Sequence, residues 1–397
     1  MNLKIRTKIK IKKNNLLSSW AMCLIALQFA NTIPIFKFID EMKLKHIFIV
    51  LAIVWGLLSD IGGRKIALKN YGREVIQVLK MISVLLAITF VYMHFHGFTT
   101  KWISELYFLA APILLVYVCL KDDCSFSQFK WYVDIMYYWT VPCYLFFVMK
   151  TMISGIQISF SFANSISTFE QSAAHIFLLL YIFYTFYGER KKRIVTGLCS
   201  VLAWKRMCLL YFIFVSFVDL IKPRLKETEI PKHYIYIVTA MIALIPVMLQ
   251  FIVSDTFSNW FERVTGLDFK YFTMFRFYTI TTMFESDIPS QGLVSFMYID
   301  VPWHDRFVHI SPHNDILRLY FEVSIVGVVS LVYGIGRLCR NYYSFLVVVY
   351  LYIEMIVSHF LGNGGLPFWI IAYFSIFCFN THAPYDCRPE RDQGGYD

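Results

Sequence analysis

The sequence predicts an all-α polytopic membrane protein with about twelve transmembrane helices, and three observations carry that prediction. First, 58% of the 397 residues are hydrophobic and only 16% are charged. Second, apolar runs of about 20 residues, the length that crosses a bilayer as a helix, recur from end to end. Third, strongly basic loops between the runs alternate with loops that carry fewer positive charges. Backbone polar groups in lipid must be satisfied within the segment, so the runs are expected to be helices.

The apolar runs define the elements in chain order. Residues 1–15 are basic and are expected in the cytoplasm, and no small-residue cleavage site follows them. The first run is therefore predicted to be an uncleaved helix. Transmembrane helices 1–9 are expected within residues 16–253. The predicted apolar segments are 16–36, 46–61, 75–93, 103–120, 131–153, 172–187, 194–204, 207–221, 233–253, 314–336, 343–360 and 366–380.

Residues 194–221 predict a short hairpin rather than one long helix. The flanking loops, 188–193 and 222–232, are both strongly basic, and both are therefore expected on the cytoplasmic side. An even number of crossings must lie between them, which requires two half-spans or a re-entrant hairpin with Lys205 and Arg206 at its tip. At about 1.5 Å per residue, the first arm spans about half of the hydrocarbon core. The two cations are therefore expected in a polar cavity.

The one long loop, 254–312, is expected on the periplasmic face. Aromatic and methionine residues are dense over 271–284 and predict a helix that lies in the membrane interface, ended by the proline and glycine that follow. Transmembrane helices 10–12 are expected within residues 313–380. The polar tail, 381–397, is expected in the cytoplasm.

Cysteine spacing and charge exclude several function classes. The nine cysteines are scattered singly, so neither a disulfide framework nor a zinc site is predicted. The formal charge of +10 comes from basic residues that cluster in short loops, where membrane orientation explains them, and no nucleic-acid partner is expected. The histidines and aspartates of "HDRFVHISPHND" (304–315) would admit a metal site. The Ser311-Pro312 break interrupts any helix there, and no metal is predicted.

The stretch "ISPHNDILRLYFEVSIVG" (310–327) is the most specific signal in the chain. On a helix, Asp315, Arg318 and Glu322 share one face. One interpretation is structural: Asn314 or Asp315 is the N-cap, and Arg318 and Glu322 form an i,i+4 ion pair at the membrane rim. That interpretation does not explain a carboxylate roughly two turns deep, because ionisable residues inside a membrane are functional candidates by default.

A string of the form H-N-x-x-L-x-x-x-x-E-x-x-x-x-G runs from His313 to Gly327. It resembles a motif of the superfamily of O-antigen polymerases and O-antigen ligases (Wzy/WaaL-like), which are membrane glycosyltransferases of bacterial envelopes. Upstream, Arg276 opens a helix-like run that ends in "PSQGLVSF" (289–296), similar to the family's stretch before its His-Asn pair. The chain departs from the family at Ser324, where the family often has glycine.

An earlier segment, "LCSVLAWKRMCLLYF" (198–212), is similar to the family's short segment with a basic pair, here Lys205 and Arg206. It departs at Trp204, where a small residue or serine usually precedes the pair. The resemblance covers the order of spans from about 172 to 380 and the plan of about twelve helices.

The resemblance implies a metal-independent glycosyl transfer at the periplasmic face of the bacterial inner membrane, with a glycan on undecaprenyl diphosphate as donor and no cofactor. Diphosphate is a good leaving group, so the chemistry needs cations where charge develops. Lys205, Arg206 and Arg276 are expected to bind it, since guanidinium groups bind phosphate oxygens bidentately. His313 is the expected catalytic base, because its ordinary pKa of about 6.5 leaves it neutral and able to take a proton from a sugar hydroxyl.

The remaining motif residues are given supporting roles. Asn314 is expected to bind substrate or to orient the His313 ring, and Glu322 is expected to position His313 or Arg318 from below. A structural interpretation stays open for the cations as well. Lys205 and its neighbour would then be a turn that snorkels to the outer surface, and Arg276 would pair with Glu285 or anchor an interfacial helix.

Three functions remain after these observations. The first choice is an O-antigen (polysaccharide repeat-unit) polymerase, which moves the growing glycan onto a new lipid-linked unit, with a chain-length regulator protein as a candidate partner. The first alternative is an O-antigen ligase, whose acceptor is lipid A–core. The second is a polysaccharide or lipid transporter or flippase, for which related halves and broken helices at the midplane would be expected and are not evident. The two enzyme hypotheses require that Arg206, Arg276 and His313 converge on one outward-facing cavity.

Overall fold

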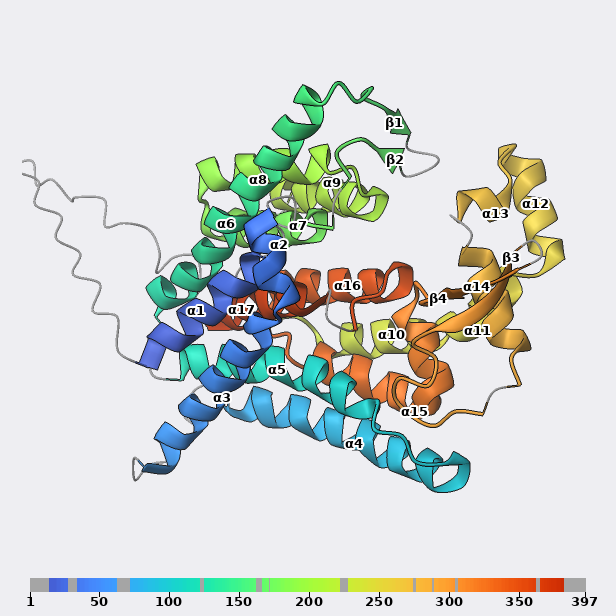
Figure 1. The fold of residues 1–397 in the computed structure, drawn as a ribbon, viewed down its shortest axis with the longest axis horizontal. Coiled ribbons are helices and arrows are strands. Elements are labelled where there is room, and N and C mark those ends of the chain that lie inside the picture. Colours follow the sequence, from blue (N-terminus) through green and yellow to red (C-terminus); the bar gives the residue numbers. More distant parts are fainter. Residues whose placement is uncertain are drawn as a thin grey trace, which may run out of the picture.

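The chain folds into a bundle of helices, most of which run along one direction of the molecule (Figure 1). The computed structural model describes residues 14–27, 34–62, 72–121, 125–161, 166–170, 172–221, 228–273, 276–287, 289–303, 306–361 and 365–381. The two segments expected in the cytoplasm, 1–15 and 381–397, lie almost entirely outside the described residues.

The helices follow the predicted apolar runs closely. They are α1 (Asn14–Leu27), α2 (Pro34–Glu41), α3 (Leu44–Gly62), α4 (Gly72–His96), α5 (Trp102–Leu120), α6 (Phe126–Ile153), α7 (Ala174–Tyr187), α8 (Arg190–Leu202), α9 (Arg206–Ile221), α10 (Lys232–Ala243), α11 (Ile245–Ile252), α12 (Asp255–Thr265), α13 (Phe269–Phe272), α14 (Arg276–Glu285), α15 (Asp315–Gly336), α16 (Tyr342–Val357) and α17 (Leu366–Thr381). Two antiparallel hairpins pair β1 (Phe160–Ser161) with β2 (Ile166–Ser167) and β3 (Ile299–Trp303) with β4 (Arg306–Ile310).

Three predicted segments each contain two helices. The first run, 16–36, contains α1, which ends at Leu27, and α2, which begins at Pro34, a residue suited to a helix start, and residues 28–33 between them lie outside the described residues. The run 233–253 divides at Leu244 into α10 and α11. The interfacial helix expected over 271–284 is instead two pieces, α13 and α14, and Met283 of α14 is fully buried against β3 rather than lying free in an interface.

Helix length and composition indicate a membrane protein. Four helices are long and apolar enough to cross a bilayer: α4, α5, the combined α10 and α11 (Lys232–Ile252), and α15. Apolar side chains on the outer surface of α10 and α11 are more than half exposed, as expected where lipid covers them: Met241, Val247 and Phe251. Length and composition therefore identify four spans among the described residues, and the full set of about twelve spans stays a prediction.

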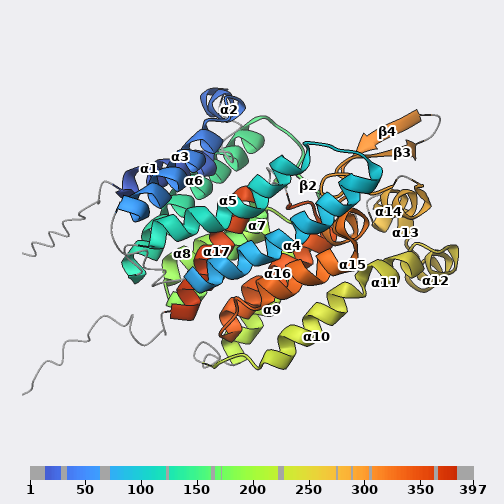
Figure 2. The same cartoon turned by 90° about the horizontal axis from the view of Figure 1, so that it is seen from below.

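The bundle has two chemically different ends. The first, here called the basic end (residues 188–193, 228–232 and 337–341), is held by ion pairs. Lys192 lies 2.6 Å from Asp134, Arg193 lies 3.3 Å from Asp219, and Arg340 pairs with Glu74. The second, the loop end (residues 255–310), carries α12, α13, α14 and the β3–β4 hairpin. Both ribbon views place these loop-end elements together at the right (Figures 1 and 2).

Residues 190–221 form the predicted hairpin. Arg193, near the start of α8, contacts Asp219, near the end of α9, so the two helices are antiparallel. Gly197 faces the rings of Phe212 and Tyr181, and a Cβ there would approach the Phe212 ring to 3.1 Å. The tip of the hairpin therefore points away from the basic end, as the charge pattern predicted.

Candidate functional site

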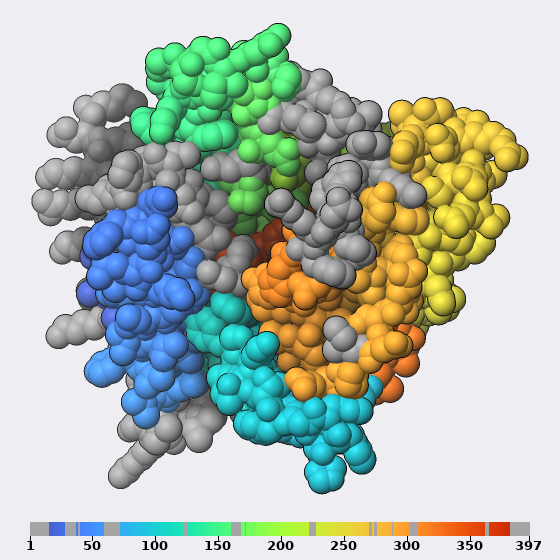
Figure 3. Space-filling model, turned by 45° about the vertical axis from the view of Figure 1, so that its right-hand side comes forward, coloured from blue at the N-terminus to red at the C-terminus, as the bar shows by residue number. Residues whose placement is uncertain are grey.

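A cavity of about 370 Å³ lies among α7, α9, α11, α13, α14, the start of α15 and the end of α16. Five of the predicted site residues line it: Lys205, Arg206, Arg276, His313 and Asn314. They come from three segments that are far apart in the sequence, and the expected convergence of Arg206, Arg276 and His313 on one cavity is observed. The space-filling view shows the molecular surface recessed between the green and orange parts of the chain, the two parts that supply lining residues on this face (Figure 3).

The hairpin tip presents its two cations through a sharp turn. Trp204 joins α8 to α9 with a positive φ of 53°, a conformation that glycine adopts more easily than other residues. Lys205 forms an ion pair with Glu170. Both terminal nitrogens of Arg206 donate to the carbonyl oxygen of Phe272, at 3.3 and 3.4 Å, and the guanidinium lies 5.2 Å from the centre of that ring. These contacts hold the tip against α13.

Arg276 and His313 face the hairpin tip from the loop end. Burial lowers the pKa of Arg276, and the nearby cation of Arg206 lowers it further. No ion pair involves Arg276 among the residues that the structure describes. Desolvation lowers the pKa of His313 below its ordinary value, with the charge of Arg276 as the next cause, so the imidazole is neutral at neutral pH. The cavity therefore combines clustered positive charge with an uncharged imidazole.

Asn314 begins α15 as its N-cap. Its side-chain oxygen accepts a hydrogen bond from the backbone N–H of Leu317 at 2.8 Å, which confirms the expected cap. The next residue, Asp315, connects the start of α15 to the segment that follows α16. One carboxylate oxygen accepts from the N–H groups of Phe360 and Leu361, at 2.6 and 2.8 Å, and the other lies 2.9 Å from Nδ1 of His359.

Arg318 and Glu322 do not line this cavity. Both are fully buried in the bundle, so the ion pair expected at the membrane rim is wrong in its location. Arg318 pairs with Glu105 of α5, and its Nε lies 3.8 Å from a carboxylate oxygen of Asp315 and of Glu322. The burial has a simple cause: α5 packs against α4, and α4 packs against α15, so this face of α15 is inside the protein. These ion pairs therefore hold α15, whose first turn lines the cavity, in the bundle without lining the cavity themselves.

Glu322 anchors the segment that precedes the β3–β4 hairpin. Its carboxylate accepts from the backbone N–H of Phe296 at 3.1 Å, and its backbone carbonyl accepts from the Ser290 hydroxyl at 2.7 Å. Between these contacts, Gly292 has a φ of 92°, and a Cβ there would lie 2.7 Å from the main chain of Thr89. The "PSQGLVSF" stretch therefore needs glycine for close approach to α4.

One wall of the cavity is apolar. It is built by α11, α13 and α14 and contains Leu249, Ile252, Phe269, Phe272, Ile280 and Met283. The charged groups line the rest of the cavity and the start of α14, where Arg276 lies, and three cations stand against two carboxylates, Glu170 and Glu354. The cavity is thus amphiphilic, with a surface for hydrocarbon beside a surface for an anion.

Sequence reasoning did not place Cys208 and Glu354 at this site. Together with His175 they meet beside the cavity from three helices, and the structure also brings His359 to Asp315. The one available signal was an acidic residue, Glu354, inside an apolar run. The proximity of the other side chains depends on packing between distant segments, which no local pattern encodes.

Comparison with protein-family models, with curated proteins and with solved structures returns no match to this chain. The fold and the cavity themselves define a helical membrane protein with a cationic, partly apolar cavity at the end opposite its basic loops.

Proposed function

We propose that the chain is a membrane glycosyltransferase that polymerises polysaccharide repeat units carried on undecaprenyl diphosphate. The observation that carries the proposal is the meeting of Lys205, Arg206, Arg276 and His313 around one cavity. Three cations face two carboxylates, Glu170 and Glu354, around this cavity, and such an excess of positive charge in a partly buried site favours an anionic ligand. The resemblance of the motifs that carry these residues supports the same conclusion.

The amphiphilic walls favour a lipid-linked anion over a soluble one. The apolar wall of α11, α13 and α14 would contact the polyprenyl chain, and α11 is part of a helix long and apolar enough to span a bilayer. Arg206 and Arg276 would bind the diphosphate oxygens. A guanidinium pair is suited to this because each planar fork can hold two phosphate oxygens.

The transfer requires one proton movement and one displacement. Nε2 or Nδ1 of neutral His313 takes the proton of the acceptor hydroxyl as its oxygen bonds to the anomeric carbon of the donor glycan. The bond between that carbon and the diphosphate oxygen breaks, and the electron pair leaves with undecaprenyl diphosphate. The cations stabilise the charge that develops on the leaving group. The lowered pKa of His313 keeps the base unprotonated before the reaction.

The test replaces His313 with alanine and compares the result with the same replacement of a nearby histidine, His309, as a control. His313→Ala is expected to abolish the polymer ladder on a lipopolysaccharide gel, in a deletion strain complemented with the variant, while the protein stays at wild-type abundance in the membrane fraction. His309→Ala is the matched control, because His309 is exposed on β4 and pairs only with Asp300 there, 3.0 Å away. This control is expected to restore the full ladder.

The gel separates the rival functions. A single repeat unit left on lipopolysaccharide indicates the polymerase, whereas loss of all O-antigen with accumulated lipid-linked polymer indicates an O-antigen ligase. Loss of both polymer and periplasmic lipid-linked units indicates a flippase. A normal ladder with His313→Ala would remove the imidazole from the mechanism and overturn the proposal.

A further inference from the structure

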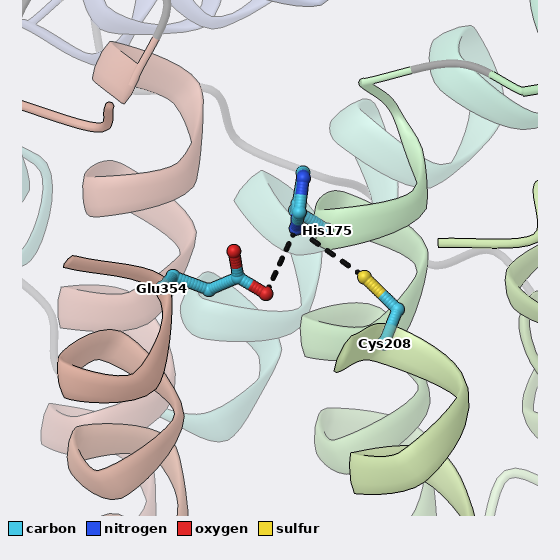
Figure 4. A group of neighbouring side chains, drawn as sticks. All are labelled: His175, Cys208 and Glu354. Carbon is cyan, nitrogen blue, oxygen red and sulfur yellow. Dashed lines mark hydrogen bonds and ion pairs between the residues drawn. The ribbon is translucent and has the colours of Figure 1, made fainter. Parts of the chain in front are cut away.

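His175 of α7, Cys208 of α9 and Glu354 of α16 form a compact buried cluster beside the cavity (Figure 4). One ligand atom from each side chain lies within 4.8 Å of the other two. The imidazole Nδ1 is 3.1 Å from a carboxylate oxygen of Glu354 and 3.3 Å from the sulfur of Cys208. Three helices from distant parts of the chain thus aim a nitrogen, a sulfur and an oxygen at one point.

Hydrogen bonding alone does not account for this cluster. The Tyr350 hydroxyl lies 3.2 Å from both Nδ1 of His175 and the Cys208 sulfur, so three groups converge on one ring nitrogen. A ring nitrogen makes only one hydrogen bond, as donor or as acceptor. Glu354 is fully buried, and no hydrogen bond of good geometry reaches either of its carboxylate oxygens from the described residues. The contact with His175 Nδ1 supplies positive charge only when that ring is protonated, whereas a metal ion bound by both groups supplies it with the ring neutral.

Two of the three separations are close to those of a tetrahedral zinc site, and the third, from sulfur to oxygen, is within 4.8 Å. With Zn–N of about 2.0 Å and Zn–S of about 2.3 Å, tetrahedral angles separate nitrogen from sulfur by about 3.6 Å and nitrogen from oxygen by about 3.3 Å. The observed separations of 3.3 and 3.1 Å differ from these by a few tenths of an ångström. A mixed thiolate, imidazole and carboxylate set favours zinc over magnesium or calcium, which prefer oxygen ligands.

We infer that His175 Nδ1, Cys208 Sγ and the Glu354 carboxylate bind one zinc ion, with the Tyr350 hydroxyl beside the fourth position. Binding releases the thiol proton and replaces the crowded contacts on Nδ1 with metal bonds. The ion would join α7, α9 and α16, the helices that form one wall of the cavity. The role is structural, and the inference stands on this geometry without the proposed transfer reaction.

The experiment measures metal in the full chain purified in detergent. The protein is incubated with zinc, dialysed against metal-free buffer and analysed by mass spectrometry of the elements. About one zinc ion per chain is expected for the wild type, and at least about tenfold less for Cys208→Ser and Glu354→Gln. Cys143→Ser is the matched control, since Cys143 is a buried cysteine of α6 outside the cluster, and it is expected to retain zinc.

A second readout uses the wild-type chain alone, so that a misfolded variant does not decide the result. Cobalt added in place of zinc is expected to give the near-ultraviolet thiolate-to-cobalt charge-transfer band, and zinc is expected to raise the unfolding temperature relative to chelator. Wild-type protein that holds no zinc after dialysis and shows no such band overturns the inference. His313→Ala is expected to keep the zinc, so failure of the proposed transfer and failure of this site are distinguishable.

Discussion

Arg318 is the largest fully buried side chain in the described part of the chain, and it lies among three carboxylates. Removing the guanidinium leaves Glu105 and Glu322 buried without their counter-charge, while Asp315 keeps His359 and two backbone N–H donors. Breaking a buried ion pair in this way costs about 3–5 kcal/mol. We therefore expect Arg318→Leu to lower the free energy of unfolding by that amount, measured by denaturation of the detergent-solubilised protein, and to reduce its abundance in the membrane.

The same helix offers a control of the same residue type. Arg337 is exposed at the end of α15, with its guanidinium 5.7 Å from the ring of Tyr333, and Arg337→Leu is expected to cost less than about 1 kcal/mol. An Arg318→Leu protein that keeps its stability but loses the proposed transfer would contradict the structural role. It would indicate instead that Arg318 takes part in the transfer reaction.

Individual residues were predictable from the sequence to different degrees. Lys205 and Arg206 stand out because charge is rare in apolar runs, whereas Arg276 lies in the long loop and was predicted from the motif resemblance alone. Glu105 was not, because it meets Arg318 from 213 positions away and nothing near either residue records the pairing. Local patterns reveal which residues are unusual, whereas their partners depend on how helices pack.

At the scale of elements, the kink inside α15 is the clearest feature. Val323 and Ser324 leave the helical conformation, and Ser324 has φ 60° and ψ 178°, a region that is essentially restricted to glycine. Holding a non-glycine residue in this region destabilises the folded state by about 1–3 kcal/mol. Glycine removes that strain, but its greater conformational freedom in the unfolded chain offsets about 0.5–1 kcal/mol of the gain in stability. We therefore expect Ser324→Gly to raise the free energy of unfolding by about 1 kcal/mol in denaturant titration.

At another serine of the same helix, a glycine substitution is expected to lower the free energy of unfolding instead of raising it. Ser330 has ordinary helical geometry, so Ser330→Gly is expected to lower stability by about 0.5–1 kcal/mol. Equal destabilisation by the two glycines would show that the kink is absent in solution.

The apolar runs predicted most helices, because burial in lipid or protein imposes the same composition. The loop end was predicted least well. Residues 254–312 were expected to hold one interfacial helix, yet they form α12, α13, α14 and the β3–β4 hairpin. Alternating side chains over 299–303 and 306–310 are too short a signal for strands in a chain dominated by helices. Their core, around Leu317 of α15, forms only in the folded chain.

At the scale of the whole molecule, the arrangement of charge predicts orientation. Ion pairs at the basic end join α4, α6, α8, α9 and the α15–α16 turn, so these loops share one end of the bundle. The cavity with its cations opens among elements of the loop end. Basic loops are retained in the cytoplasm. The cavity is therefore expected to face the opposite compartment, as a periplasmic transfer requires.

Single cysteines in a background without the native ones test this orientation. Lys191 and Arg340 are exposed at the basic end, and Glu262 and His309 are exposed at the loop end. A membrane-impermeant maleimide is expected to label Glu262→Cys and His309→Cys in intact cells. Lys191→Cys and Arg340→Cys are expected to react only after permeabilisation. If a loop-end and a basic-end cysteine label alike in intact cells, the two ends do not lie on opposite sides, and the cavity would not share a compartment with periplasmic glycans.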